Sequence, residues 1–269
     1  MNIFKRIFIT GGGGYVGCAL SDYLVEKGYE VTVFDLFIYG KDVFNNKDKI
    51  KIIEGDIRNS KLLDESIKNH DAVIHLACIS NDPSFEMNPK LGRSINFDAF
   101  EPLIQISKKN KVKRFIYASS SSVYGIKIEK NVNEEMSLEP LTDYSKFKAD
   151  CEKILFNYTS NEFETVVIRP ATVCGYSKRQ RLDVIVNILT NLAFHKREIS
   201  VFGGDQLRPN IHIKDMIRAY EVILLSDKKN VNGQIFNAGW QNLSVNEISN
   251  SVKKIIGDDV KIIKSATND

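Results

Sequence analysis

Short apolar runs alternate with longer amphipathic stretches through the first two thirds of the chain. The runs are rich in β-branched and aromatic residues, and each has the length of a single strand. They predict strands at residues 6–10, 30–35, 50–56, 71–77, 114–120 and 164–170. Between them, apolar positions at helical spacing predict helices at residues 14–28, 60–69, 89–111 and 143–161. Apolar strands separated by helices indicate an α/β fold, with a parallel sheet covered on both faces.

This alternation ends after Pro170. Beyond it, the pattern predicts a short strand at residues 199–204 and helices at residues 181–198, 214–226 and 244–257. We therefore expect a doubly wound sheet domain over residues 1–170 and a smaller C-terminal lobe, mainly concerned with substrate, over residues 171–269. Residues 234–238 are one more candidate strand, which could return to the sheet.

Composition narrows the possible functions. The 269 residues include 37 basic and 34 acidic ones, a formal net charge of +3. This balance argues against a dedicated nucleic-acid binder, although it allows a local basic pocket for phosphates. The sequence has no apolar run of about eighteen residues that could span a membrane, and its N-terminal apolar part is too short for a signal peptide. The four cysteines match no zinc or redox spacing, which favours reduced thiols in a cytoplasmic protein without a metal site; they are Cys18, Cys78, Cys151 and Cys174.

A glycine-rich turn separates the first predicted strand from the first predicted helix. Gly11, Gly14 and Gly17 recur at intervals of three, with Tyr15 and Val16 between the last two. Glycine at these places lets the backbone turn sharply, lets a pyrophosphate approach, and exposes the N–H groups at the helix N-terminus. A flexible turn without a ligand is the alternative, but the strand–turn–helix context favours a Rossmann-type dinucleotide site.

Acidic residues end the next two predicted strands. Asp35 follows Gly17 by eighteen residues, where a carboxylate accepts hydrogen bonds from both adenosine ribose hydroxyls and repels a 2′-phosphate. No basic residue adjoins it, so we expect NAD rather than NADP. Asp56 and Ile57 end the third strand, where the adenine edge would lie; an Asp that only caps the strand is an equally open interpretation.

Candidate catalytic groups follow the fifth predicted strand. Tyr144 and Lys148 lie one helical turn apart on one face. A neighbouring ammonium and a cationic nicotinamide would lower the pKa of the tyrosine and make it a usable base. Four serines at residues 119–122 close the strand, and a hydroxyl there could bond the reacting oxygen. These serines could equally do no more than cap the strand end.

Together and in this order, these motifs resemble the extended short-chain dehydrogenase/reductase superfamily. Within it, the chain is similar to the NAD-dependent epimerase/dehydratase family, which acts on nucleotide-activated sugars, and the similarity runs from Arg6 to the end. The resemblance implies a catalytic set and further cofactor contacts. The catalytic set is Ser120, Tyr144 and Lys148, and the further contacts are Leu76 and Ala77 near the nicotinamide-side ribose and Arg169 and Pro170 beside the nicotinamide.

The resemblance also implies where a nucleotide diphosphate sugar would bind. The segment "VFGGDQLRPNIHIKD" is similar to the family segment in which an arginine holds the diphosphate, here Arg208. Arg181 could join that basic pocket. The loop after the fourth strand and the serine run would face the sugar, which makes Ser80, Asn81, Ser121 and Ser122 candidate substrate contacts.

One departure from the family bears on the reaction. The 4,6-dehydratases carry an Asp-Glu pair directly after the active-site hydroxyl residue, whereas this chain has Ser121 and Ser122, so we do not expect dehydration. We expect Tyr144 to take the proton from a sugar hydroxyl at C4. A 4-epimerase, like UDP-glucose 4-epimerase, would return the hydride to the other face of the sugar. A 4-dehydrogenase would release the ketone, a ketoreductase would run in reverse, and a non-catalytic NAD sensor is a more remote alternative.

Two further expectations concern the whole chain. Family members usually continue beyond the point where this sequence ends, so we expect a truncated C-terminus. The helices predicted around residues 99–110 and 143–161 resemble the pair that forms a four-helix dimer contact in the superfamily. We therefore expect a homodimer.

Overall fold

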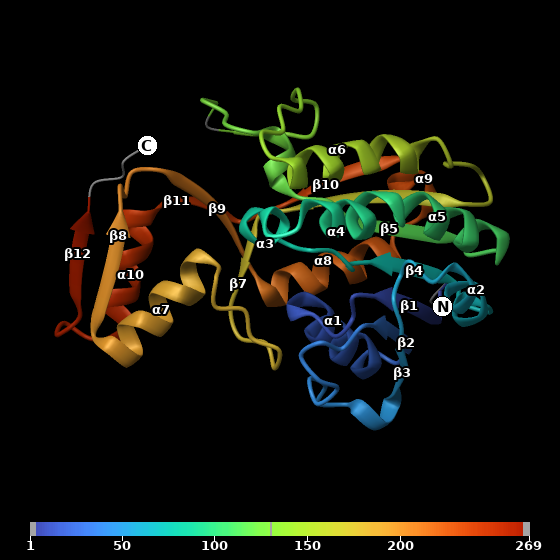
Figure 1. Ribbon diagram of the computed structural model, residues 1–269, viewed down its shortest axis with the longest axis horizontal. Coiled ribbons are helices and arrows are strands. Elements are labelled where there is room, and N and C mark those ends of the chain that lie inside the picture. The colour runs from blue at the N-terminus through green and yellow to red at the C-terminus, as the bar shows by residue number, and fades with distance from the viewer. Residues whose placement is uncertain (1–3, 130, 266–269) are drawn as a thin grey trace.

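The computed structural model describes residues 4–129 and 131–265, which form a sheet domain with a smaller lobe beside it (Figure 1). Seven parallel strands form the main sheet, in the order β10-β6-β5-β4-β1-β2-β3. These strands are β1 (Arg6–Thr10), β2 (Glu30–Asp35), β3 (Ile50–Glu54), β4 (Ala72–His75), β5 (Arg114–Ala118), β6 (Glu164–Pro170) and β10 (Gln234–Ala238). The predicted parallel α/β sheet is confirmed, and residues 234–238 do return to it.

The strands inside the sheet bury both of their faces because their residues are mostly apolar on both sides, whereas the edge strands β3 and β10 are less buried. In β1, Ile7 and Ile9 join one core and Phe8 joins the other. Helices α1 (Tyr15–Glu26) and α8 (Ile213–Leu225) cover the first face. The opposite face is covered by α2 (Ser60–Ile67), α5 (Phe100–Lys109) and α6 (Asp143–Phe156).

Part of the predicted lobe belongs to the sheet domain. Helix α8 packs on α1, and Met216 and Tyr220 are buried in the same core as Ile7. The short helix α9 (Lys228–Val231) follows α8 and precedes β10. The chain thus leaves the sheet domain after residue 170 and re-enters it before residue 240.

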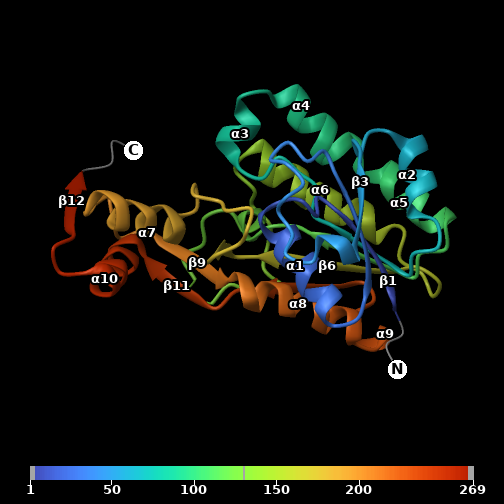
Figure 2. The same cartoon turned by 90° about the horizontal axis from the view of Figure 1, so that it is seen from below.

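The lobe itself has a separate apolar core, which includes Leu189, Ile199, Ile248 and Val252. Figure 2 shows it beside the sheet domain, joined through β9 and β11. Its elements are α7 (Ile185–Lys196), β8 (Glu198–Phe202), β11 (Gln241–Ser244), α10 (Val245–Ile256) and β12 (Lys261–Ser265). Strands β7 (Thr172–Cys174) and β9 (Leu207–His212) form a three-stranded sheet with β11, while β12 pairs with β8.

The helix predicted over residues 89–111 is interrupted. It consists of α4 (Pro89–Arg93), a π-helical turn at Ser94–Asp98, and α5. The turn carries Asn96, whose side chain accepts a hydrogen bond from the Ile79 N–H at 2.8 Å and donates one to the Ile79 carbonyl at 2.9 Å. This pair of bonds fixes the loop after β4, which leads into the short helix α3 (Asp82–Glu86).

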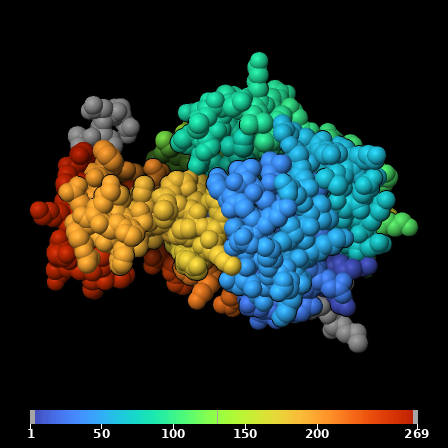
Figure 3. Space-filling view, turned by 60° about the horizontal axis from the view of Figure 1, so that its bottom comes forward, coloured from blue at the N-terminus to red at the C-terminus, as the bar shows by residue number. Residues whose placement is uncertain are grey.

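The segment after β7 fills the space between the two parts of the molecule. Figure 3 shows it in yellow, between the blue N-terminal region and the orange lobe. Lys178 donates a hydrogen bond to the Phe44 carbonyl at 2.8 Å, and the Arg179 guanidinium stacks on the Tyr39 ring at 3.8 Å from its centroid. Among the described residues, no helix combines the length and apolarity needed to cross a membrane.

Candidate active site

The glycine turn lies in the crevice between β1 and β4, where the strand order reverses. Gly11 has a φ of +73°, and a Cβ there would lie 2.5 Å from the Ala77 nitrogen. A Cβ on Gly17 would collide with the Gly11 carbonyl. Gly14 caps α1 without a side-chain hydrogen bond, so the N-terminal N–H groups of α1 face outward. The turn therefore has the close packing and the open helix end that a pyrophosphate requires, with Leu76 and Ala77 forming the β4 side.

Asp35 is held beside this turn by its own main chain. Its carboxylate accepts hydrogen bonds from the Gly13 N–H at 2.9 Å and the Phe37 N–H at 2.8 Å. Each oxygen keeps capacity for another donor, such as a ribose hydroxyl. Asp56, at the end of β3, is engaged differently, because its carboxylate pairs with Arg58 at 2.5 Å. The Arg58 hydrogen bonds hold the pKa of Asp56 below its ordinary value.

Other predicted cofactor residues present little side chain to a ligand. The Tyr15 hydroxyl is buried and donates to the Gly175 carbonyl at 2.6 Å, which joins α1 to the segment after β7. Val16 packs on the core below α1, and Ile57 is buried in the core on the opposite face of the sheet. Pro170 ends β6. Contacts from these four residues to a cofactor would come mainly from their main chain.

Helix α6 begins one residue before Tyr144, and its N-terminus is fixed by a capping box. The Thr142 hydroxyl accepts a hydrogen bond from the Ser145 N–H at 3.2 Å, and the Ser145 hydroxyl accepts one from the Thr142 N–H at 3.1 Å. This cap sets where the first turn of α6 starts, and so where Tyr144 stands. The helix then places Lys148 one turn further along the same face.

Lys148 connects the helix to the end of β5. Its ammonium donates to the Ala118 carbonyl at 2.7 Å. It lies 4.9 Å from the Tyr117 ring centroid and 5.8 Å from the Tyr144 ring centroid. The residues at the end of β5 and at the start of α6 are therefore neighbours, as their positions in the sequence predict.

Ser120 completes this group. It caps a 3₁₀ turn at Ser121–Tyr124, and its oxygen accepts hydrogen bonds from the Ser122 N–H at 3.1 Å and the Ser122 hydroxyl at 2.8 Å. Ser120 lies close enough to Tyr144 to lower the pKa of the phenol. The structure thus brings Ser120, Tyr144 and Lys148 together, with Ser121 and Ser122 in the same turn.

Burial has the largest effect on the pKa of Tyr144. It raises the pKa of the phenol, and the Cys78 thiol adds to that, while Lys148, Ser120 and Arg181 lower it without offsetting burial. Burial also acts to lower the pKa of Lys148, but its electrostatic interactions with Cys78 and Tyr144 raise that pKa above its ordinary value. The chain alone therefore holds a neutral phenol beside an ammonium at neutral pH. The lysine by itself does not supply the pKa lowering expected from the sequence.

The Arg169 side chain is engaged by buried partners within the chain. Its guanidinium forms a buried ion pair with Glu152, at 2.6 Å, and donates to the Tyr124 hydroxyl at 2.7 Å. The Ser119 hydroxyl donates to the same Glu152 carboxylate, and the Tyr124 hydroxyl donates to Asn237 at 2.7 Å. Since these partners occupy the guanidinium, a contact of Arg169 with the nicotinamide would come from its main chain, and the expected place of Arg169 beside the nicotinamide stays a prediction. The side chain instead holds the serine turn and α6 together.

Three predicted substrate residues form one cluster beyond β4. Arg181 pairs with Asp183 at 2.8 Å and donates to the Ser80 carbonyl at 3.4 Å. The Asn81 amide donates to Asp183 at 2.8 Å, and its oxygen caps α3 by accepting from the Ser84 N–H. The side chain of Asn81 thus forms hydrogen bonds within the loop on both its nitrogen and its oxygen, which leaves it little capacity to bind a substrate.

Cys78 belongs to the same region, because its thiol acts on the pKa of Tyr144, Lys148 and Arg181. The sequence favours a buried apolar role for it. The signal that could have revealed its place is its position two residues beyond Leu76, at the carboxyl end of β4.

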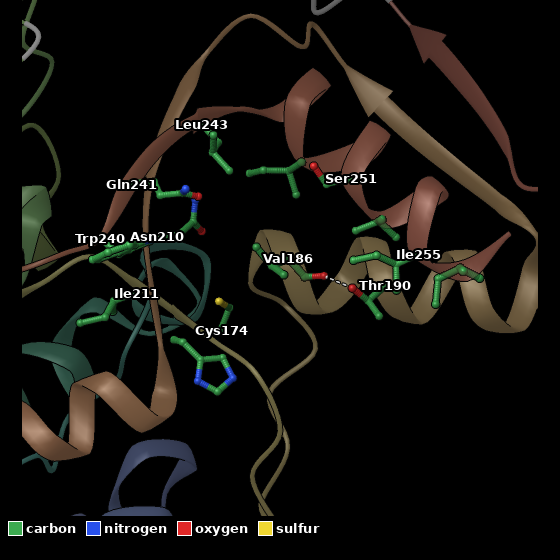
Figure 4. Close-up of a pocket in the computed structure, with 14 residues that line it drawn as sticks. Cys174, Val186, Thr190, Asn210, Ile211, Trp240, Gln241, Leu243, Ser251 and Ile255 are labelled. Carbon is green, nitrogen blue, oxygen red and sulfur yellow. Dashed lines mark hydrogen bonds between the residues drawn. The ribbon is translucent and has the colours of Figure 1, made fainter. Parts of the chain in front are cut away.

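Arg208 lies apart from this cluster, on an exposed part of β9. Next to it, a cavity of about 320 Å³ lies between β9, β11, α7 and α10 (Figure 4). Leu243, the β11 partner of Arg208, lines this cavity together with Asn210 and Trp240. No single sequence motif predicts the cavity, because its lining comes from β7, β9, β11, α7 and α10, which are separate in the sequence.

This fold and site define a class of proteins: α/β proteins with a dinucleotide-binding sheet and a Ser-Tyr-Lys group at the end of the fifth strand. Residues 7–239 match the model of the "NAD dependent epimerase/dehydratase family", and the chain belongs to that family. Its cofactor is NAD. The residues at the β1–β4 crevice fit this cofactor, since they combine a side-chain-free turn, an open helix N-terminus and a carboxylate for the ribose.

Individual relatives differ in activity. A dTDP-D-glucose 4,6-dehydratase of Dictyostelium discoideum is 30% identical, over 94% of this chain and 62% of that protein, so the chain spans less than two thirds of its length. A UDP-glucose 4-epimerase of Lactobacillus helveticus is 26% identical, over 95% of this chain and 83% of the relative. The structure of a UDP-N-acetylglucosamine 4-epimerase from Methanobrevibacter ruminantium, in complex with UDP-N-acetylmuramic acid, superposes with a TM-score of 0.90. It is 25% identical and covers 98% of this chain and 86% of that one.

Proposed function

We propose that this chain is a nucleotide-sugar 4-epimerase, similar in reaction to UDP-glucose 4-epimerase, which works through a 4-keto intermediate. One observation carries the proposal: Ser120, Tyr144 and Lys148 converge at the end of β5, and hydroxyl residues rather than carboxylic acids follow Ser120. Two of the relatives described above are 4-epimerases of UDP-sugars, which supports it.

The proposed roles follow from the geometry. Tyr144, as phenolate, removes the proton from the C4 hydroxyl, while Ser120 donates a hydrogen bond to the same oxygen. Lys148 holds a positive charge next to Tyr144 and stabilises the phenolate. When bound, NAD supplies the hydride acceptor. Arg208, on β9, binds the diphosphate.

A 4,6-dehydratase would need catalytic groups that an epimerase does not. Eliminating water from the sugar needs a further acid and base next to the reacting carbons. Ser121 and Ser122 carry hydroxyls, which neither donate nor accept a proton readily at neutral pH. We therefore propose epimerisation over 4,6-dehydration, although dehydratases are among the relatives.

The test is a product assay with purified protein, NAD and a panel of nucleotide sugars, following NADH absorbance and separating products by chromatography. An isomer formed without net NADH supports the epimerase. Accumulating NADH with a 4-keto sugar would identify a dehydrogenase, and a 4-keto-6-deoxy sugar would identify a dehydratase. NAD binding without any turnover would favour a sensor.

Tyr144→Phe serves as the control for that assay. It removes the phenolic oxygen and leaves the ring and the Lys148–Ala118 contact in place. Turnover should fall by about 10²–10⁴-fold, while NAD still binds. If this variant keeps full turnover, Tyr144 is not the base.

A further inference from the structure

Lys148 carries a buried positive charge, and no carboxylate in the described part of the chain pairs with it. The residue is 5% exposed, and its ammonium donates to one acceptor, the Ala118 carbonyl, at 2.7 Å. Glu152, the buried acid of the same helix, pairs instead with Arg169 at 2.6 Å. Because removing an ammonium from water is costly when it has so few partners, another group must stabilise the charge.

The ring of Tyr117 is in a position to do so. Its centroid lies 4.9 Å from the Lys148 Nζ, which stands over the ring, whereas the Tyr144 centroid lies at 5.8 Å. The face of an aromatic ring carries negative charge and attracts a cation, most strongly where water is excluded. Since Tyr117 is 1% exposed, this contact is desolvated.

Neighbouring rings hold Tyr117 in this orientation. His75, its partner on β4, stacks on it with 5.8 Å between ring centroids and 18° between ring planes. Phe100 of α5 lies 4.6 Å from it, measured between ring centroids. Burial lowers the pKa of His75 to about 3, so the imidazole is neutral and does not repel the ammonium. The place of the Tyr117 ring is therefore set by the sheet and α5, and not by Lys148.

Other ionisable groups act on the Lys148 ammonium from α6 and from the loop after β4. Against the effect of burial, which lowers it, each of them raises the pKa of Lys148; in decreasing order of effect they are Cys78, Tyr144, Cys151 and Glu152. Tyr144, however, is a neutral phenol until it gives up its proton. The Tyr117 ring differs from it in attracting the ammonium both before and after that step.

We propose that Tyr117 is a positioning residue, whose ring face fixes the Lys148 ammonium between the Ala118 carbonyl and Tyr144. The ammonium is then already in place when the phenolate forms, and stabilises it. Since its ring is buried, Tyr117 acts on the reaction only through Lys148. The inference rests on the proposed function in taking Tyr144 and Lys148 as the pair that moves the proton, whatever sugar product results.

The main experiment is a double-mutant cycle of Tyr117→Leu and Lys148→Met, with turnover of a nucleotide sugar by the NAD-loaded protein as the readout. Tyr117→Leu keeps an apolar side chain and removes the ring face. Turnover at neutral pH should fall by about tenfold, the scale of one desolvated cation–π contact. In the Lys148→Met background, where no ammonium is left to hold, Tyr117→Leu should change turnover by no more than about twofold.

Two control variants separate this role from core packing. Tyr117→Phe keeps the ring and should keep turnover and its pH profile. Phe115→Leu removes another buried ring from the same face of β5, over which no cation lies in the described part of the chain. It should destabilise the fold as Tyr117→Leu does, measured by thermal unfolding, but leave turnover of the folded protein within about twofold.

A fluorinated series tests the ring face while keeping its shape. Phenylalanine with one, two or three ring fluorines is incorporated at position 117, and each fluorine withdraws electron density from the ring face. Turnover should fall stepwise with the number of fluorines, while thermal unfolding shows that the protein stays folded. This series decides the question even if Tyr117→Leu does not fold.

The ionisation of Tyr144 gives a readout that needs no substrate. NMR of the NAD-loaded protein with isotope-labelled tyrosine rings follows this ionisation, and Tyr144→Phe assigns the signal. The pKa of Tyr144 should be higher in Tyr117→Leu than in the unaltered chain, because the ammonium is less firmly held beside it. Tyr117→Phe and Phe115→Leu should leave that pKa unchanged.

Several outcomes would overturn the proposal. These are an equal loss of turnover in Tyr117→Leu and Phe115→Leu, a loss that persists in full in the Lys148→Met background, a fluorine series without any trend, or an unchanged pKa of Tyr144 in Tyr117→Leu. If no sugar is turned over, the epimerase is rejected and the NMR titration alone decides the role of Tyr117. Isomer formation that Tyr117→Leu does not affect rejects the positioning role and leaves the epimerase.

Discussion

At the scale of single residues, the proposed reaction depends on how the charge of Lys148 acts on Tyr144, the proposed base. Because burial already raises the pKa of Tyr144, removing the Lys148 ammonium should raise it further. The base is active when deprotonated, so the rising limb of the kcat–pH profile should move to higher pH in Lys148→Met. At neutral pH its turnover should fall, and part of it should return as the pH is raised.

The matched control for this variant is Lys146→Met, on the same helix. Lys146 is exposed and pairs with Asp143 at 3.4 Å. Its substitution should leave the pH profile in place. A profile that does not move in Lys148→Met would show that the lysine does not tune the base.

A second prediction at this scale concerns Asp35, which we propose sets the preference for NAD over NADP. Its carboxylate is held by the Gly13 and Phe37 N–H groups, so its position does not depend on a ligand. Asp35→Asn keeps the size but removes the charge that repels a 2′-phosphate. The ratio of NAD to NADP affinity, measured by calorimetry, should fall by about tenfold, about 1.4 kcal/mol. An unchanged ratio would contradict the role assigned to Asp35.

At the scale of elements, the buried ion pair of Glu152 and Arg169 joins the two segments that carry the proposed catalytic residues. The Glu152 carboxylate, on α6, binds Arg169 of β6 and Ser119, directly before Ser120. Arg169 in turn binds Tyr124, at the other end of the serine turn. One ion pair thus fixes both ends of that turn relative to α6. Removing either charge would leave the other buried and unpaired, at a cost of about 3–5 kcal/mol of folding stability.

A milder change tests this positioning without unfolding the protein. Tyr124→Phe removes one hydroxyl and keeps the Glu152–Arg169 pair, so it should cost about 1–3 kcal/mol of stability. Because the serine turn loses one of its two anchors, kcat should drop while KM for the sugar changes little. Tyr176→Phe is the control, since Tyr176 is 79% exposed. Equal kcat values in the two variants would reject the positioning role.

The elements also show what the sequence could and could not predict. Periodicity located the sheet strands, and the spacing of Tyr144 and Lys148 predicted that the structure brings these two residues together, because that information is local. Amphipathicity showed that residues 214–226 are helical but not that they pack on α1, which depends on the whole fold. Arg169 was assigned a cofactor contact although a buried Glu152 was its partner, since two residues 17 apart in sequence give no pairing signal. Trp240, directly before β11, donates its main-chain N–H to the carbonyl of Asn210 on β9. No contiguous motif predicts this contact, because the two residues are 30 positions apart in the sequence.

At the scale of the whole molecule, helices α5 and α6 offer a surface on which two copies of the chain could associate. Helices α5 and α6 lie side by side on the outside of the sheet (Figure 1). Their outer surface includes the half-buried Ile154, and Tyr158, whose hydroxyl donates to Glu101 at 2.6 Å and accepts from Gln105 at 2.9 Å. A second copy related by a twofold axis could pack the same two helices against these, forming four helices around the axis.

We predict that the chain forms a homodimer through α5 and α6. Light scattering of the purified protein should give twice the mass of one chain, and Ile154→Arg should give the mass of one chain because it places a charge in the contact. The control is Val222→Arg, which places the same charge at an exposed apolar residue of α8 on the opposite face of the sheet. Since α6 carries Tyr144 and Lys148, loss of the dimer should also lower turnover by loosening that helix. A mass of one chain for the unaltered protein would show that it does not form a dimer. A dimer that survives Ile154→Arg but not Val222→Arg would show that the contact does not lie on α5 and α6.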